Sequence, residues 1–220
     1  MSARTRFEHE MGVLKLDLIE MGRLIEQAIE DVVLAFKNQD HNLAREIIKG
    51  DSAVNDMQHT IESRCLALIL RQQPVARDLR IVSTALKVVT DMERIGDQAA
   101  DIAEILLHME GENIFKESIH IPEMAKISKE MVHDAIEAFA KEDLEAARLI
   151  AGRDDLVDEL FCKVKEDVLE MFRSGAEISD HGIDLLMIGK YLERVGDHAQ
   201  NICEWIEFCQ KGTVNSVKIL

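Results

Sequence analysis

The sequence predicts an all-α protein of two tandem three-helix bundles, six long helices in all, related by internal duplication. Three observations predict this fold: a long heptad spacing of apolar residues, a composition that favours helices, and an acidic motif that occurs twice. Hydrophobic residues make up 47% of the 220 residues, aromatic residues only 4%, and there are 2 prolines. Straight-chain side chains lose little rotamer freedom in a helix, so this mixture favours helices over sheets.

The first expected helix is marked by apolar residues that recur in alternating steps of four and three. Such spacing gives one buried stripe along a long helix in a bundle. The stripe consists of Phe7, Met11, Leu14, Leu18, Met21, Ile25, Ala28, Val32 and Ala35.

Two further helices complete the first bundle. A second helix is expected at 40–71, where Gln-Gln-Pro at 72–74 interrupts it, because proline cannot continue a helix interior. A third is expected at about 75–109. Its apolar seam consists of Ala85, Val88, Met92, Ile95, Ala99 and Ile102.

The pattern then starts again. After a linker, helices are expected at about 122–140, 142–173 and 180–210, with short turns that favour antiparallel neighbours. The predicted organisation is a first repeat at 1–110, a linker at 111–121, a second repeat at 122–212 and a C-terminal tail at 213–220.

Two ungapped matches indicate the duplication. The segment Met-Glu-Arg-Ile-Gly-Asp at 92–97 matches Leu-Glu-Arg-Val-Gly-Asp at 192–197, an offset of 100 residues. Upstream the offset is 103 residues. There Asp40, Ala44, Arg45, Ile47, Asp51 and Val54 match Asp143, Ala147, Arg148, Ile150, Asp154 and Val157.

Net charge, apolar stretches and cysteine content exclude several classes of protein function and location. A net charge of −16 disfavours binding to nucleic acids and to anionic membranes. No stretch approaches the ~20 apolar residues of a membrane span, and no signal peptide is recognisable. The 4 cysteines form no CxxC pair, so we expect free, partly buried thiols rather than a zinc ribbon. These features predict a soluble, cytoplasmic protein without direct membrane insertion.

The repeated motif places acidic residues on one helix face. Glu93, Asp97 and Asp101 are spaced i, i+4, i+8, and the second copy offers Glu193, Asp197 and Asn201. Like charges at i, i+4 destabilise a helix by roughly 0.2–0.5 kcal/mol per pair. A bridging cation would reverse this sign, because hard ions bind several oxygen ligands.

Antiparallel pairing about each hairpin turn brings further acids to the same level. The carboxylates expected opposite the two stripes are Asp51 and Asp56 in the first repeat and Asp155 and Glu159 in the second. Gly96 and Gly196 lie within the stripes, where a missing side chain permits close backbone approach. The alternative interpretation is a solvated helix face, with Arg94 and Arg194 in ordinary ion pairs. The predicted metal ligands are Glu93, Asp97, Asp101, Glu193, Asp197, Asn201, Asp56 and Glu159.

Oxygen ligands of this kind suit magnesium, calcium, manganese or iron. The ferritin-like di-iron pattern requires ExxH on each of two helices, and the match from Glu117 to His120 falls in the linker. His198 has no counterpart in the first repeat, which has Gln98, and we interpret it as a surface or supporting residue rather than a ligand.

Positive charge gathers around the first hairpin turn. It comes from Arg71, Arg77, Arg80 and Lys87. Solvated surface charges are one interpretation, and a patch that docks an anion or a partner through Arg77 and Arg80 is the other.

The two copies of E-R-[IV]-G-D-x-A, with Asp-Leu-Arg at 78–80 before the first, resemble the PhoU family of phosphate-uptake regulators. The resemblance extends from Phe7 to about Gln210. It implies two three-helix bundles, a cytoplasmic homodimer, and multinuclear metal clusters on Glu93, Asp97 and Asp101 and on Glu193 and Asp197. Asn201 departs from a full acidic triplet, which leaves equal metal loading open.

The same resemblance implies negative regulation of phosphate uptake. The partners that it implies are the ATPase of the phosphate ABC transporter and the phosphate-sensing histidine kinase. We therefore interpret the chain as a non-enzymatic, metal-binding adaptor. Two other functions stay open: a metal-dependent phosphohydrolase that uses the clustered carboxylates, and an anion- or polyphosphate-binding protein that depends on Arg77 and Arg80.

Overall fold

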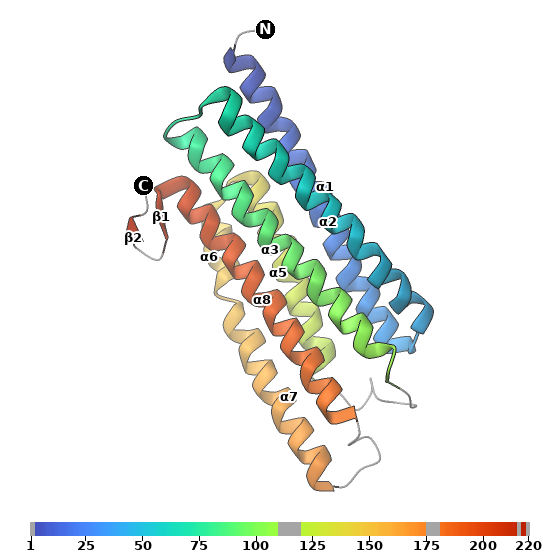
Figure 1. Cartoon of the computed structure of the whole chain (residues 1–220). Coiled ribbons are helices and arrows are strands. Elements are labelled where there is room, and N and C mark those ends of the chain that lie inside the picture. Colours follow the sequence, from blue (N-terminus) through green and yellow to red (C-terminus); the bar gives the residue numbers. More distant parts are fainter. Residues whose placement is uncertain (1–2, 110–119, 175–180, 215–216, 219–220) are drawn as a thin grey trace.

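The structure is a computed structural model that describes residues 3–109, 120–174, 181–214 and 217–218. In the first repeat, α1 spans Ala3–Asn38, α2 spans His41–Gln72 and α3 spans Arg77–Leu106 (Figure 1). The side chain of Asp40 caps α2 by accepting from the backbone N–H groups of Asn42 and Leu43, both at 3.0 Å. The helix ends before Pro74, as the sequence predicts.

The second repeat contains α5 at Ile121–Lys141, α6 at Leu144–Ala151, α7 at Asp154–Ser174 and α8 at Gly182–Lys211. The single helix expected at 142–173 is therefore wrong, because Gly152 and Arg153 separate α6 from α7. Two acidic residues, Asp154 and Asp155, occupy the first turn of α7, where the helix dipole favours negative charge. Arg153 Nη1 holds the break against α5 by donating to Asp134 Oδ2 at 2.6 Å.

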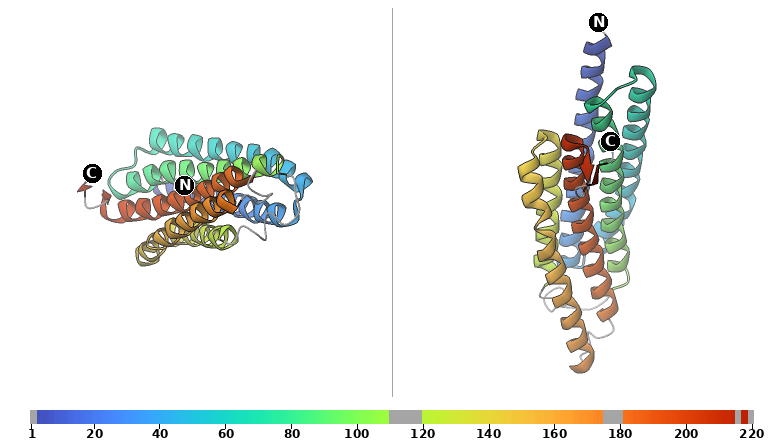
Figure 2. Two further views of the ribbon diagram at one scale, coloured as in Figure 1. Left: turned by 90° about the horizontal axis from the view of Figure 1, so that it is seen from below. Right: turned by 90° about the vertical axis from the view of Figure 1, so that its left-hand side faces the viewer.

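The two bundles, one from each repeat, pack against each other along α3 and α8 to form one body. Helices α3 and α8 lie side by side at the centre, α2 lies outside α3, and α7 lies outside α8 (Figure 1). Helices α1 and α5 pack behind this layer, α1 against α2 and α3 and α5 against α8 (Figure 2). The expected linker at 111–121 falls mostly outside the described residues.

The core follows the apolar stripes that the sequence marks. Eight of the nine stripe positions in α1 are buried, Ala28 being partly buried, and all six seam positions in α3 are buried. A single apolar core runs through both repeats. After α8, β1 at Thr213–Val214 pairs antiparallel with β2 at Val217–Lys218. None of the described helices combines the length and the apolar character needed to cross a membrane.

The cysteines are free thiols, as the sequence predicts. Cys65, Cys203 and Cys209 are buried, whereas Cys162 is exposed. Burial raises the pKa of the Cys65 and Cys203 thiols to about 12, so both stay protonated at neutral pH and act as apolar core residues.

Candidate metal centres

The first acidic cluster lies between α2 and α3. Helix α3 supplies Glu93, Asp97 and Asp101, and α2 supplies Asp51. The Glu93 side chain is only 15% exposed. Among the described residues, Asp51 Oδ1 and Glu93 Oε2 are buried without a hydrogen-bond partner. Buried carboxylate oxygens without a donor are costly, so this cluster has an unmet need for positive charge or hydrogen-bond donors.

The pKa values of the carboxyl groups in the first cluster indicate the same lack of positive charge. Burial, followed by the negative charge of Asp97, raises the pKa of Asp51, Glu93 and Asp101. Arg94 offsets only part of this repulsion, since Nη1 donates to Asp97 Oδ2 at 2.9 Å while Nε lies 3.4 Å from Glu93 Oε2. A bound cation would relieve repulsion that a single surface arginine does not.

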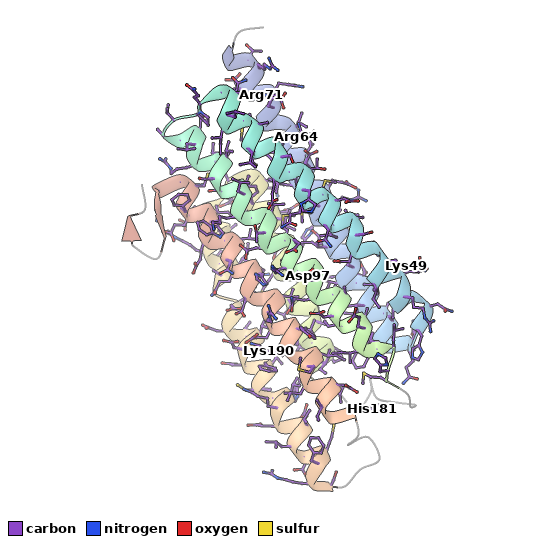
Figure 3. The ribbon with its side chains drawn as sticks, in the orientation of Figure 1. Lys49, Arg64, Arg71, Asp97, His181 and Lys190 are labelled. Atoms are coloured by element: carbon purple, nitrogen blue, oxygen red, sulfur yellow. The ribbon has the colours of Figure 1, made fainter. Side chains whose placement is uncertain are left out.

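The second cluster repeats the arrangement between α7 and α8. Asp154 of α7 is 7% exposed, and its Oδ1 is buried without a hydrogen-bond partner in the described part of the chain. Burial, then Asp197, raises the pKa of Asp154 to about 6, with smaller contributions from Asp158 and Glu193. Burial and Glu193 also raise the pKa of Asp197. Figure 3 shows Asp97 on α3 and, on neighbouring α8, Lys190, which pairs with Glu193.

Glycines allow the paired helices to approach at these clusters. A Cβ added to Gly196 would lie 3.0 Å from Asp154 Oδ1, and one added to Gly96 would lie 3.6 Å from Asp51 Oδ1 and 3.0 Å from Val54 Cγ1. The absence of a side chain therefore makes room for Asp154 at Gly196 and for Val54 at Gly96, whereas Asp51 lies within ordinary van der Waals range of Gly96.

The structure brings together most, but not all, of the sequence-predicted ligands. Asp56 and Glu159 are exposed, and neither perturbs the cluster carboxylates; Asp155 is exposed as well. The inner positions are occupied by Asp51, which the antiparallel pairing does place opposite the first stripe, and by Asp154, which it does not. The signal that identifies them is the repeat itself, since they match each other at the offset of 103 residues.

The third stripe positions face the opposite repeat. Asn201 Nδ2 donates to Asp91 Oδ1 at 3.3 Å, and the Tyr191 hydroxyl bonds to Asp101. Positions 91 and 191, like 101 and 201, are equivalent in the two repeats, so these contacts are related by the duplication. The charges of Asp97 and Asp51 still raise the pKa of Asp101, so Asp101 remains part of the first cluster. Asn201 instead forms its hydrogen bond with Asp91.

His198 supports this inter-repeat contact. Its Nδ1 lies 2.9 Å from Asp91 Oδ1, and both side chains are largely buried, at 17% and 13% exposed. The interpretation of His198 as a supporting residue thus agrees with its geometry. Asp91 was not anticipated, because nothing in the sequence marks it as a partner of a residue more than 100 positions away.

The carboxylates are of the right chemical type to bind a cation, but they are not arranged as a complete coordination shell. In the described part of the chain, no three His, Cys, Asp or Glu side chains converge as ligands of one ion. The oxygen donors, the unpaired buried atoms and the raised pKa values nevertheless match a hard or borderline cation. The chain could hold it through Asp51, Glu93, Asp97 and Asp101, and through Asp154, Glu193, Asp197 and Asp158.

The predicted docking arginines have intramolecular roles. Arg80 Nε donates to the Cys209 carbonyl at 3.1 Å, and Arg77 Nη2 donates to Glu142 Oε2 at 2.9 Å. Lys87 lies over the Trp205 ring, 5.7 Å from its centroid. These three residues join the first hairpin to the second repeat, which reduces their capacity to bind an external anion.

Comparison with known proteins identifies the family. The profile of the PhoU domain matches residues 18–106 and 121–206, one copy for each repeat. The chain belongs to the PhoU family. The "Phosphate-specific transport system accessory protein PhoU homolog" of Clostridium acetobutylicum is 37% identical over 202 residues, covering 91% of this chain and 92% of that protein. The PhoU protein of Escherichia coli is 30% identical over 207 residues, covering 94% and 86%.

Solved PhoU structures share the fold. The crystal structure of the phosphate transport system regulatory protein PhoU from Streptococcus pneumoniae superimposes with a TM-score of 0.89 at 27% identity, covering 96% of this chain and 100% of that one. PhoU from Pseudomonas aeruginosa gives 0.88 at 30% identity, covering 94% and 100%. This PhoU protein therefore shares the whole helical body of its relatives, both repeats included.

Proposed function

We propose that this PhoU protein restrains phosphate uptake as a non-enzymatic accessory protein of a phosphate transport system. The observation that carries the proposal is the match over both repeats to proteins named as accessory proteins of phosphate-specific transport. A match of one repeat would support only a shared domain. A match over nearly the full length of both chains supports a shared role.

The proposal includes metal binding at both acidic clusters. The buried oxygens of Asp51 and Asp154 that have no hydrogen-bond partner support it. Glu93 supports it as well, because its side chain is largely buried and the half-exposed Arg94 lies 3.4 Å away without forming a hydrogen bond to it. When bound, the cation would supply that charge and draw α2 against α3 and α7 against α8. Asn201 bonds to Asp91, so the second cluster relies on Asp158 rather than Asn201.

The finer parts of the proposal concern partners and location. The protein acts in the cytoplasm between the ATPase of the phosphate ABC transporter and the phosphate-sensing histidine kinase, as a homodimer. The two acidic clusters lie on one face of the molecule, formed by α2, α3, α8 and α7 (Figure 1). A bound metal would change the shape and charge of this acidic face. This gives the clusters a route to influence docking without any catalytic step.

Phosphate uptake in cells tests the proposal. Phosphate-replete cells that lack the gene should take up excess phosphate, and the wild-type gene should correct this. A Glu93→Gln/Glu193→Gln variant should fail to correct it while accumulating normally. The matched control is Asp56→Asn/Glu159→Gln, which removes the same number of charges from exposed positions and should restore regulation. Unchanged uptake in the deletion would contradict the regulatory role. Metal-dependent phosphoester turnover by the purified protein, lost in Glu93→Gln/Glu193→Gln, would favour a phosphohydrolase instead.

A further inference from the structure

A second polar site lies away from the acidic clusters, in a cleft of about 280 Å³ between the N-terminal part of α1 and the C-terminal half of α2. Small side chains on one face of α2 make room for it: Thr60, Ser63 and Ala67. A single water needs roughly 10–15 Å³, so the cleft accepts a much larger group. Figure 3 shows Arg64 and Arg71 along this part of α2, beside the start of α1.

Positive charge dominates the cleft. Arg6, Arg64 and Arg71 line it, and among the described residues Glu10 is the one acidic side chain that does so. In a chain with a net charge of −16, three arginines around one cleft stand out from the surrounding surface. An anion of phosphate type would be attracted here and repelled from the acidic face of α2, α3, α8 and α7.

Arg64 is positioned for such a role by its protein contacts. Its Nε donates to Asp17 Oδ2 at 2.7 Å, and Nη1 lies 3.4 Å from Glu10 Oε2. A guanidinium carries five N–H donors, so these two contacts orient the group and leave further donors for a ligand. The Arg64 side chain is 27% exposed, which keeps it in reach of the cleft while limiting its rotation.

Arg6 and Arg71, unlike Arg64, are not held by ion pairs with carboxylates of the described residues. Within the described ranges, neither forms a hydrogen bond or ion pair with another residue. The first turn of α1 contains no acidic residue and contains Arg6, although the positive end of a helix dipole disfavours cations. An anion in the cleft would interact favourably with both arginines.

The second repeat gives an internal comparison. At the offset of 103 residues, the positions of Ser63, Arg64 and Ala67 correspond to Glu166, Asp167 and Glu170. The same helix face is therefore acidic in the second repeat. The arginine-lined cleft is thus a feature of the first repeat and not a packing feature common to both.

We propose that the α1–α2 cleft binds a phosphate-type oxyanion through Arg6, Arg64 and Arg71, with the Ser63 hydroxyl as an additional donor. Guanidinium groups bind phosphate through paired, charge-assisted hydrogen bonds, which suits a cleft flanked by several arginines. The site is separate from the acidic clusters and its existence does not depend on the proposed regulatory role. It also replaces Arg77 and Arg80 as the residues through which this protein would bind an anion.

Binding of orthophosphate and tripolyphosphate to the full-length protein tests this proposal. Isothermal titration calorimetry with and without a chelator separates direct anion binding from binding through a metal. We expect one saturable site per chain that persists with chelator and weakens as salt is added. Arg6→Gln/Arg71→Gln should lower the affinity roughly a hundredfold or more, because it removes two charge-assisted contacts to the anion. Both residues are exposed, so the variant should fold normally.

Lys163→Gln/Arg173→Gln is the matched control, because it also removes two positive charges from exposed positions, both on α7, and Arg173 lies in the last turn of α7 as Arg71 does in that of α2. It should bind like the wild type. Tighter binding of tripolyphosphate than of orthophosphate would identify a chain of phosphates as the ligand, and similar binding would identify a single phosphate group. Absence of saturable binding, or equal affinity in Arg6→Gln/Arg71→Gln and wild type, would overturn the proposal. So would complete loss of binding with chelator.

Discussion

Asp154 of α7 lies against Gly196 of α8, with its Oδ1 3.0 Å from the point that a Cβ on Gly196 would occupy. Asp51 and Gly96 repeat this relationship in the first bundle, at 3.6 Å. In both repeats a carboxylate of the neighbouring helix thus lies beside a glycine of the acidic stripe, and at Gly196 the approach is closer than an ordinary Cβ contact allows. A glycine within a helix costs about 1 kcal/mol relative to alanine, so retaining it at this point has a stability cost.

We predict that Gly196→Ala weakens cation binding without the stability gain normal for a helical glycine. The new Cβ would lie 3.0 Å from Asp154 Oδ1 and 3.4 Å from Val157 Cγ1, so Asp154 has to move away. Gly12→Ala in α1 is the control, because nothing lies within 4 Å of its added Cβ. That control should gain about 0.5–1 kcal/mol in urea denaturation. A Gly196→Ala variant with a similar gain and unchanged cation affinity would contradict the prediction.

The helices could be predicted from the sequence because their apolar stripes are long and regular. The break between α6 and α7 could not. Gly152 marks it, but Gly50 lies inside the continuous helix α2, so glycine alone does not decide where a helix stops. The difference comes from tertiary contacts, such as the bond from Arg153 to Asp134 across to α5.

The acidic stripes could be predicted as well, but not all their partners. Counting from the hairpin turn gives the level of the opposing residue along the neighbouring helix. It does not give the direction of each side chain, which rotates by about 100° per residue. Asp56 and Glu159 are near the right level but exposed, whereas Asp51 and Asp154 face inward. The Asp91–His198 contact depends on how α3 and α8 pack, which neither helix alone specifies.

A second prediction concerns pH. Burial and Asp197 raise the pKa of Asp154 from 3.8 to about 6 in the folded protein. The folded state then binds more protons than the unfolded state between about pH 4 and 6, so this group's contribution to stability is lost as pH rises through that window. One pKa unit corresponds to about 1.4 kcal/mol, so the cost at neutral pH is about 3 kcal/mol at most.

Asp154→Asn should remove that cost. With chelator present, the variant should be more stable than wild type in urea denaturation at pH 7.5, and the difference should shrink towards pH 5. Glu159→Gln, at an exposed position of the same helix whose charge does not contribute to the raised pKa of Asp154, is the control and should show little pH-dependent difference. A variant that is less stable than wild type at pH 7.5 would show that Asp154 contributes favourable contacts that outweigh its repulsion.

A third prediction concerns metal addition. A divalent cation should raise the thermal midpoint of unfolding of the chelator-treated protein, because it binds the folded state and neutralises the carboxylates whose pKa values are raised there. Asp51→Asn/Asp154→Asn should abolish most of this shift, and Asp56→Asn/Glu159→Gln should keep it. Differential scanning calorimetry with magnesium, calcium, manganese and iron(II) gives the shifts. Equal shifts in both double variants would mean that the cations bind elsewhere on this acidic chain.

The last prediction concerns the junction between repeats. Asp91 Oδ1 accepts from Asn201 Nδ2 at 3.3 Å and lies 2.9 Å from His198 Nδ1, in a largely buried position between α3 and α8. Asp91→Ala leaves both groups without this acceptor, and we expect a loss of about 1–3 kcal/mol in the free energy of unfolding. Glu46→Ala, which removes an exposed acid on α2, should change it by no more than about 0.5 kcal/mol.

A double-mutant cycle separates the contact from a general effect of truncation. If Asp91 and His198 act through each other, the losses in Asp91→Ala and His198→Ala should not add in the double variant, with a coupling energy of about 0.5 kcal/mol or more. Additive losses would show that the two side chains stabilise the interface separately. The contact lies where the two repeats meet, so loss of Asp91 should also make urea unfolding less cooperative, with a lower m-value, as one repeat begins to unfold before the other.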